Sequence, residues 1–359
     1  MDQSLTRQVA YWTVIVLGFG WIGYIGSGVL MPLVFATIFA LFLYPVDRWL
    51  YSRIGLRWLT ITLSFLAVLV PLVLLAILFS MQLSSILDSL PAIGTTVKSG
   101  AEKAINLVNQ YLPYAKLDSE KLLTWAEPEG MAGPLGFLSQ GVATSSAVLV
   151  SASITGIYTF LILYYRRSLA NFVVFLFEGR VRPEIRSTLS RIKNTVQAYI
   201  GGLGIVIVFL AVINSLGLFI IGVKYPIFWG TVAGLLAVIP YIGTMLGGVL
   251  PVLYSLATAD SLWQPLAIVI FYGLVQFLEG NIITPKIIGD KVNINPLVAI
   301  VALVIFGQYW GIGGVILALP LTSIIRIILS QFEETESVAL LMSSTIARKP
   351  KKFEELADG

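Results

Sequence analysis

Long apolar runs, separated by short polar stretches, dominate this chain. A helix needs roughly 20 apolar residues to cross the ~30 Å hydrocarbon core of a bilayer. The runs of that order lie near Tyr11–Gly28, Val29–Val46, Trp58–Leu83, Leu135–Tyr165, Thr195–Val223 and Leu262–Gly280. We predict a membrane helix over each of them. The first is expected to be retained, because no small-residue cleavage site follows it.

Two further apolar stretches, Pro226–Thr258 and Pro296–Leu329, are interrupted by glycine and proline. The prolines that flank the two interruptions, Pro226/Pro251 and Pro296/Pro320, are 25 and 24 residues apart. Such paired, interrupted segments indicate the substrate site of a secondary transporter. We therefore predict two re-entrant hairpins, with four short full spans as the alternative. The predicted tips are Pro240, Tyr241 and Gly243 in one hairpin, and Gly307, Gln308, Gly311, Gly313 and Gly314 in the other.

The composition indicates that the chain folds in a lipid bilayer and not in water. Hydrophobic residues make up 57% and charged residues 12% of the sequence, and the mean hydropathy is +0.89. A soluble globule of 359 residues could not bury so much apolar surface. The fold class predicted is all-α, a polytopic helical membrane protein of about eight nominal spans with two opposed hairpins in its C-terminal half.

Basic residues orient these spans. A single arrangement places all twelve arginines on the cytoplasmic side, together with both termini. In that arrangement the segments Thr195–Thr258 and Leu262–Leu329 enter the membrane from opposite sides, so they form an inverted repeat. The predicted divisions are scaffold spans 1–83, an extracytoplasmic helical insert 84–134, a fourth span 135–167, a cytoplasmic amphipathic linker 168–194, a transport unit 195–329 and a cytoplasmic tail 330–359. A simple connector is the alternative for the linker.

Few polar residues lie inside the predicted transport unit, which contains seven ionisable side chains in 135 residues. Tyr272, Gln276 and Glu279 follow the spacing i, i+4 and i+7, so they share one face of a helix. An ionisable residue within a span suggests a functional site, and we expect Glu279 to be ion-linked. Asn214 and Asn281 complete the candidate solute and ion site. The alternative is that Glu279 lies at headgroup level, paired with Lys286.

The absence of cysteine and histidine excludes several chemistries together. Disulfides, thiol nucleophiles, Cys/His zinc sites, haem ligation and histidine proton relays all need those residues. No phosphate-binding G-x-x-x-x-G-K-[ST] loop occurs either. We expect no enzyme, no cofactor, no metal site and no nucleic-acid partner. Secondary transport of a small molecule or ion remains, with a passive channel or a membrane scaffold as alternatives.

The string QFLEGNIITPKIIG at 276–289, followed by Asn295 and Pro296, closely resembles the autoinducer-2 exporter family. The motif residues are Pro251, Pro285, Gly289, Asn295, Pro296 and Pro320. Many members carry histidine where this chain has Asn295. The resemblance implies a multi-pass transporter of the bacterial inner membrane, homo-oligomeric (a pentamer is one option), with elevator-like movement. It also implies export of the furanone signal autoinducer-2 or, alternatively, sodium (lithium)/proton antiport.

Overall fold

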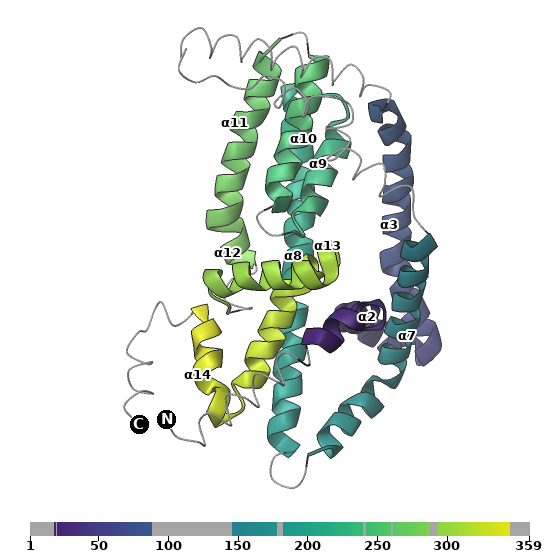
Figure 1. Cartoon of the computed structure of the whole chain (residues 1–359). Coiled ribbons are helices and arrows are strands. Elements are labelled where there is room, and N and C mark those ends of the chain that lie inside the picture. Colours follow the sequence, from purple (N-terminus) through teal and green to yellow (C-terminus); the bar gives the residue numbers. More distant parts are fainter. Residues whose placement is uncertain are drawn as a thin grey trace, which may run out of the picture. The chain divides into compact units, whose positions relative to one another are not determined.

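The described part of the chain consists of helices joined by short connections. The computed structural model describes residues 18, 20–87, 146–177, 182–239, 242–259, 261–287 and 293–344. Its regular elements are helices (Figure 1), which confirms the predicted all-α class. They are α2 (Ser27–Ile54), α3 (Arg57–Leu87), α7 (Ser146–Phe175), α8 (Arg182–Ile221), α9 (Pro226–Leu236), α10 (Ile242–Thr258), α11 (Trp263–Leu278), a π-helical segment (Glu279–Ile283), α12 (Thr284–Ile287), α13 (Pro296–Leu329) and α14 (Glu333–Met342).

Five of the described helices are long and apolar enough to cross a membrane. They contain the segments Ser27–Ile54, Arg57–Phe79, Pro183–Ile221, Trp263–Ile287 and Pro296–Leu329. Two shorter apolar helices, Pro226–Leu236 and Gly243–Leu256, accompany them. Many of their large apolar side chains are exposed, as expected for surfaces that face lipid. These helices confirm a polytopic membrane protein.

Some predicted segments lie largely outside the described residues. These are the outer insert beyond residue 87, the start of the fourth span and the tail beyond residue 344. Residues 11–17 and 19 of the first span also lie outside the described residues. The predicted linker 168–194 is entered by α7 from one side and by α8 from the other, with the described residues 176 and 177 after α7. Residues 178–181 between these helices lie outside the described residues, so the linker stays a prediction.

The chain forms two compact units. Unit 1 comprises Met1–Leu66, Val148–Gly202 and Ile288–Gly359, and unit 2 comprises Ala67–Ala147 and Leu203–Ile287. The predicted transport unit 195–329 is thus split between the two units: residues 203–287 belong to unit 2, whereas residues 195–202 and 288–329 belong to unit 1. That the two parts act as one body remains a prediction.

Unit 1 has a core formed by α2, the first half of α8 and α13, in which Ile38, Val196 and Leu317 are almost fully buried. Polar contacts connect the same helices. The Gln197 amide of α8 donates a hydrogen bond to the Leu41 carbonyl of α2, at 2.8 Å. Thr188 of α8 donates to the Gln331 side chain, at 2.7 Å. Side-chain hydrogen bonds as well as apolar packing therefore hold unit 1 together.

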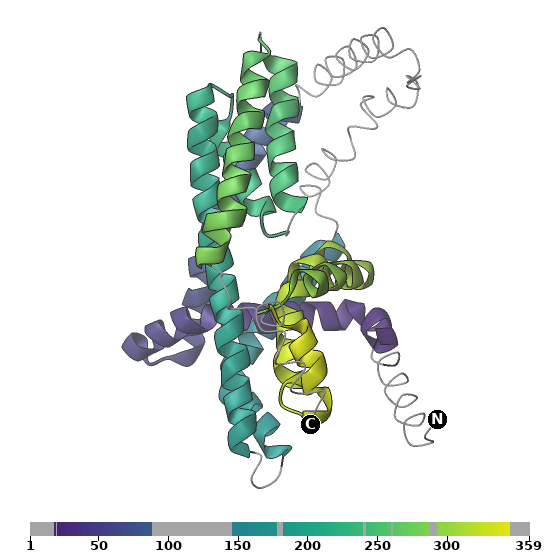
Figure 2. The same cartoon turned by 90° about the vertical axis from the view of Figure 1, so that its left-hand side faces the viewer.

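Unit 2 has its own core, formed by the second half of α8 with α9, α10 and α11 (Figure 2). Trp229, Leu218 and Ile268 are buried there, and Phe79 of α3 packs against them. Glycines let the helix backbones approach closely. A Cβ atom added at Gly230 of α9 would lie 2.3 Å from the Ser215 amide nitrogen of α8. Small residues at helix contacts are the usual means of close packing in membrane proteins.

Both interrupted stretches contain a break in the helix. In unit 2, α9 ends at Leu236 and α10 begins at Ile242, and a Cβ atom at Gly243 would lie 1.6 Å from the Leu236 carbonyl oxygen. In unit 1, α13 leaves helical geometry at Trp310 and at Gly311, where φ is 58° and ψ is −142°. Only glycine adopts that backbone conformation readily. Figures 1 and 2 show the two halves of α13 running in different directions.

Candidate solute and ion site

The predicted polar stripe on α11 runs from the interior of unit 2 to its surface. Tyr272 is partly buried beside α10, where a Cβ atom at Gly248 would lie 3.1 Å from its ring. Glu279, two turns later, is also partly buried, whereas Gln276 is exposed. The three residues share a helix, but only Tyr272 points its polar atom into the interior. Gln276 therefore lies at the surface of unit 2, and Glu279 lies at its edge.

Glu279 begins a π-helical segment that sequence reasoning did not predict. Its carbonyl accepts the Thr284 amide, five residues later. The exposed Asn281 side chain donates to the Phe277 carbonyl at 2.8 Å, a local bond of the kind that competes with regular helix. Pro285 has no N–H group to pair with the Asn281 carbonyl. Wider turns of this kind occur frequently at functional sites, and this one begins at the candidate carboxylate.

Four neutral polar atoms in unit 2 are buried without a hydrogen-bond partner: Asn214 Oδ1, Trp229 Nε1, Tyr272 Oη and Gln82 Oε1. The Asn214 side chain is 3% exposed and that of Trp229 is 1% exposed. They belong to four different helices, α8, α9, α11 and α3. Buried polar groups are normally paired, and leaving one unpaired costs about 1–3 kcal/mol. The described interior of unit 2 thus contains unsatisfied hydrogen-bond donors and acceptors.

Asn214 and Tyr272 were candidates from the sequence, whereas Trp229 and Gln82 were missed. No local signal marks Trp229, because it lies in an apolar run and its ring packs against Phe228 and Tyr254. Gln82 lies at the end of a predicted span, where a polar residue is ordinary. Only their surroundings show that these polar atoms lack partners.

The predicted hairpin tips are described only in part. Pro240 and Tyr241 lie outside the described residues, as does the motif residue Gly289. Gly307 and Gln308 are helical and precede the break at Gly311. After it, Gly313 and Gly314 are tightly packed, with a Cβ at Gly313 lying 2.0 Å from the Met31 side chain. Their role as tips beside a solute path stays a prediction.

The remaining motif residues shape the helices. Pro251 is within α10 and Pro320 within α13, and both are buried. Asn295 caps α13: its side-chain oxygen accepts the Val298 amide at 2.9 Å, with Pro296 in the first turn. Its amide donates to the Leu341 carbonyl of α14 at 2.5 Å. Asn295 therefore starts α13 and fastens α14 to it.

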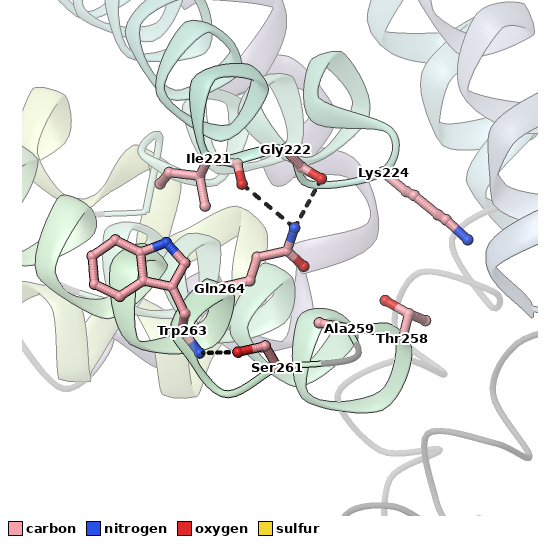
Figure 3. A pocket seen from close by; sticks show the side chains of 8 residues that line it. All are labelled: Ile221, Gly222, Lys224, Thr258, Ala259, Ser261, Trp263 and Gln264. Carbon is pink, nitrogen blue, oxygen red and sulfur yellow. Dashed lines mark hydrogen bonds between the residues drawn. The ribbon is translucent and has the colours of Figure 1, made fainter.

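A small open pocket of about 300 Å³ lies at another end of unit 2 (Figure 3). It is formed where α8 leads into α9 and where α10 leads into α11. The Gln264 amide occupies it, donating to the Gly222 carbonyl at 2.8 Å and accepting from Ser255 at 2.8 Å. Lys224 extends away from these groups (Figure 3). None of the predicted site residues lines this pocket.

Long apolar helices with many exposed apolar side chains define a polytopic helical membrane protein. The family model described as "AI-2E family transporter" matches residues 11–334. The chain belongs to this family of membrane transporters, which confirms the resemblance found in the sequence. It is accordingly a multi-pass protein of the bacterial inner membrane.

Individual relatives agree with this assignment. "Putative transport protein YhhT" of Escherichia coli K12 is 23% identical over 319 residues, 88% of each chain. "Putative transport protein YrrI" of Bacillus subtilis is 34% identical over 144 residues, 40% of each chain. "AI-2 transport protein TqsA" of E. coli K12 is 32% identical over 121 residues, 34% of this chain and 35% of TqsA. The alignments with YrrI and TqsA thus span well under half of those relatives.

Proposed function

We propose that this chain is a secondary transporter that exports a small, neutral, polar solute, and that unit 2 carries the solute. The observation that supports it best is the set of buried, unpaired polar atoms of Asn214, Trp229 and Tyr272. They offer an acceptor, a donor and a hydroxyl that can act as either. A hydroxylated furanone such as autoinducer-2 has the matching chemistry, and the printed name of the relative TqsA refers to AI-2 transport.

Glu279 is the proposed ion-linked residue. Its partly buried carboxylate begins the π-helical segment on the same helix as Tyr272. A gradient-driven cycle needs a group that can exchange an ion as the protein changes conformation, and a partly buried acid can do so. Gln276 and Asn281 are close along the helix and would support it. Antiport of sodium or lithium against protons is the second function that this carboxylate favours.

Elevator-like movement, a homo-oligomer and cytoplasmic termini belong to the same proposal. Unit 2 has a hydrophobic core of its own, as a body that moves as one must have. The helix break between α9 and α10, within unit 2, is proposed to lie beside the solute path. A passive channel would need no such break.

Flux measurements on the purified full-length chain in liposomes test the proposal. We expect autoinducer-2 to cross the membrane, faster when a proton or sodium gradient is imposed. A channel would be indicated if the flux of autoinducer-2 is independent of both ion gradients and does not saturate with autoinducer-2 concentration. Absence of autoinducer-2 flux, together with gradient-driven sodium or lithium movement, would favour the antiporter.

The Glu279→Gln variant keeps the size of the side chain and removes its charge. We expect the dependence of flux on the gradient to disappear, while downhill solute exchange continues. Glu333→Gln, at an exposed position of α14, is the matched control and should behave as wild type. Unchanged coupling in Glu279→Gln would mean that this carboxylate is structural.

A further inference from the structure

Unit 1 contains a cluster of basic side chains around one carboxylate. Asp47 of α2 is completely buried; it forms an ion pair with Arg166 of α7 and accepts a hydrogen bond from the Thr60 hydroxyl of α3 at 2.8 Å. Arg57 lies close enough to Arg166 and Arg167 for their charges to repel its own. In the sequence these arginines indicate only the orientation of the chain, and no local pattern marks Asp47.

An aromatic ring brings a further cation into the cluster. The Arg166 guanidinium lies 4.9 Å from the centre of the Tyr44 ring, and the Lys193 ammonium of α8 lies 5.5 Å from the same ring. Cations at such distances are attracted to the ring face. Four helices of unit 1, α2, α3, α7 and α8, thus supply the cluster.

The cluster carries an excess of positive charge. Its cations are Arg57, Arg166, Arg167 and Lys193 against the single carboxylate Asp47, and four minus one leaves a net charge of +3. The Arg57 guanidinium donates one hydrogen bond to the Leu163 carbonyl, at 3.1 Å, and its Nε is buried without a partner. Like charges held this closely repel one another unless an anion lies among them.

The surroundings of the cluster resemble a membrane interface. Trp58 and Tyr165, which directly follow Arg57 and precede Arg166, are 58% and 51% exposed. Trp49, with Arg53 stacked 4.4 Å from its ring centre, is 54% exposed. Exposed tryptophan and tyrosine are typical of the headgroup level of a bilayer. The most abundant anionic group at the headgroup level of a bilayer is the phosphate of a phospholipid.

We propose that Arg57, Arg167 and Lys193, organised by the Asp47–Arg166 ion pair, bind the phosphate headgroup of an anionic phospholipid. Guanidinium groups bind phosphate through paired hydrogen bonds, and lysine adds a point charge. The arginines are those that the charge rule places inside, so the lipid belongs to the cytoplasmic leaflet. A net charge of +3 selects phosphatidylglycerol or cardiolipin over zwitterionic lipid. The site is separate from the proposed solute site and independent of it.

Thermal unfolding of the detergent-solubilised full chain tests the proposal. Phosphatidylglycerol should raise Tm by about 5 °C, as a ligand well above its Kd does for a protein of this size. Phosphatidylcholine and inorganic phosphate, added in parallel, should raise it much less. Equal stabilisation by phosphatidylglycerol and phosphatidylcholine would overturn the proposal. A full effect from inorganic phosphate would assign the site to a free anion instead of a lipid.

The double variant Arg167→Gln/Lys193→Gln leaves the Asp47–Arg166 ion pair intact and should lose the preference for phosphatidylglycerol. Arg186→Gln/Lys286→Gln removes the same number of charges from exposed positions elsewhere and should keep it. An equal preference in both variants would refute the site.

Native mass spectrometry of wild-type protein taken from mixed bilayers needs no variant. It should show retained phosphatidylglycerol and little phosphatidylcholine. If neither lipid is retained and Arg167→Gln/Lys193→Gln changes the oligomer size, a second copy of the chain covers this face and the lipid site is wrong.

Discussion

The two units treat their buried polar groups differently. In unit 1 the buried Asp47 is paired with Arg166 and Thr60, and Gln197 and Thr188 bond to other helices. The buried unpaired atoms described in unit 1 are guanidinium nitrogens, those of Arg57 and Arg326. In unit 2 the corresponding unpaired atoms are neutral and belong to Gln82, Asn214, Trp229 and Tyr272.

This difference separates polar groups that stabilise the fold from polar groups that we propose bind a ligand. Paired polar groups resist removal, because deleting one partner leaves the other buried and unsatisfied. Buried neutral groups without a partner lower stability, by about 1–3 kcal/mol each, and in our proposal they bind the solute, whereas the unpaired guanidinium nitrogens bind an anion. Polar pairing thus helps to hold unit 1 together. Unit 2 also pairs a buried hydroxyl, that of Ser255 with Gln264, but it relies on close helix contacts at glycine and leaves four neutral polar atoms unpaired. Four substitutions examine that contrast.

The largest effect is expected for Asp47→Asn in unit 1. The change leaves the Arg166 guanidinium without its counter-charge, and breaking a buried pair costs about 3–5 kcal/mol. Since the Arg166 side chain remains 18% exposed, we expect about 3 kcal/mol, the lower end of this range. Thermal unfolding in detergent measures it. In a double-mutant cycle with Arg166→Gln, additive losses would show that the two side chains do not depend on one another.

Gly230→Ala examines how unit 2 is held together. The new Cβ would lie 2.3 Å from the Ser215 amide nitrogen, so α8 and α9 must separate. Overpacking of this kind costs about 1–3 kcal/mol, again measurable by thermal unfolding. Gly273→Ala is the control, because no atom lies within 4 Å of the added Cβ, and it should stabilise α11 by up to about 1 kcal/mol. Equal responses at the two glycines would argue against glycine-dependent packing.

Asn214→Leu is expected to change stability and transport in opposite directions. Replacing a buried, unpaired amide by an apolar side chain of similar size removes a desolvation penalty of about 1–3 kcal/mol. We therefore expect unfolding temperature to stay level or rise, while flux falls about tenfold or more. The pair of measurements is decisive. Destabilisation with normal flux would mean that Asn214 has a structural partner and no part in the solute site.

The smallest change is Tyr272→Phe, which deletes only the unpaired hydroxyl. Stability should stay level or rise, because no hydrogen bond is lost and a buried, unpaired hydroxyl is removed. The apparent affinity for solute should weaken about five- to tenfold, the value of one hydrogen bond. Titration of flux against solute concentration would show it as a higher KM. Tyr254→Phe, on neighbouring α10, serves as the aromatic control.

Much of the fold could be predicted because its signals are local. Apolar runs predict the helices, and glycine and proline predict their breaks, since both depend on residues within a turn of one another. The breaks after Leu236 and at Gly311 lie inside the stretches expected from this pattern. Helical spacing likewise placed Tyr272, Gln276 and Glu279 on one stripe. It could not show that Gln276 is exposed while the Tyr272 hydroxyl is buried.

The sequence by itself determined a helical membrane protein, its interrupted helices and the small set of polar residues from which a site could be built. Only the tertiary structure decided which of those residues pair. Asp47 meets Arg166 across 119 positions of the chain, and Trp229 keeps its indole N–H unpaired in the core. Local periodicity sets the face on which a side chain lies, but a hydrogen-bond partner must come from another helix. The arrangement of distant helices therefore determines whether a buried polar group supports the fold or remains free to bind.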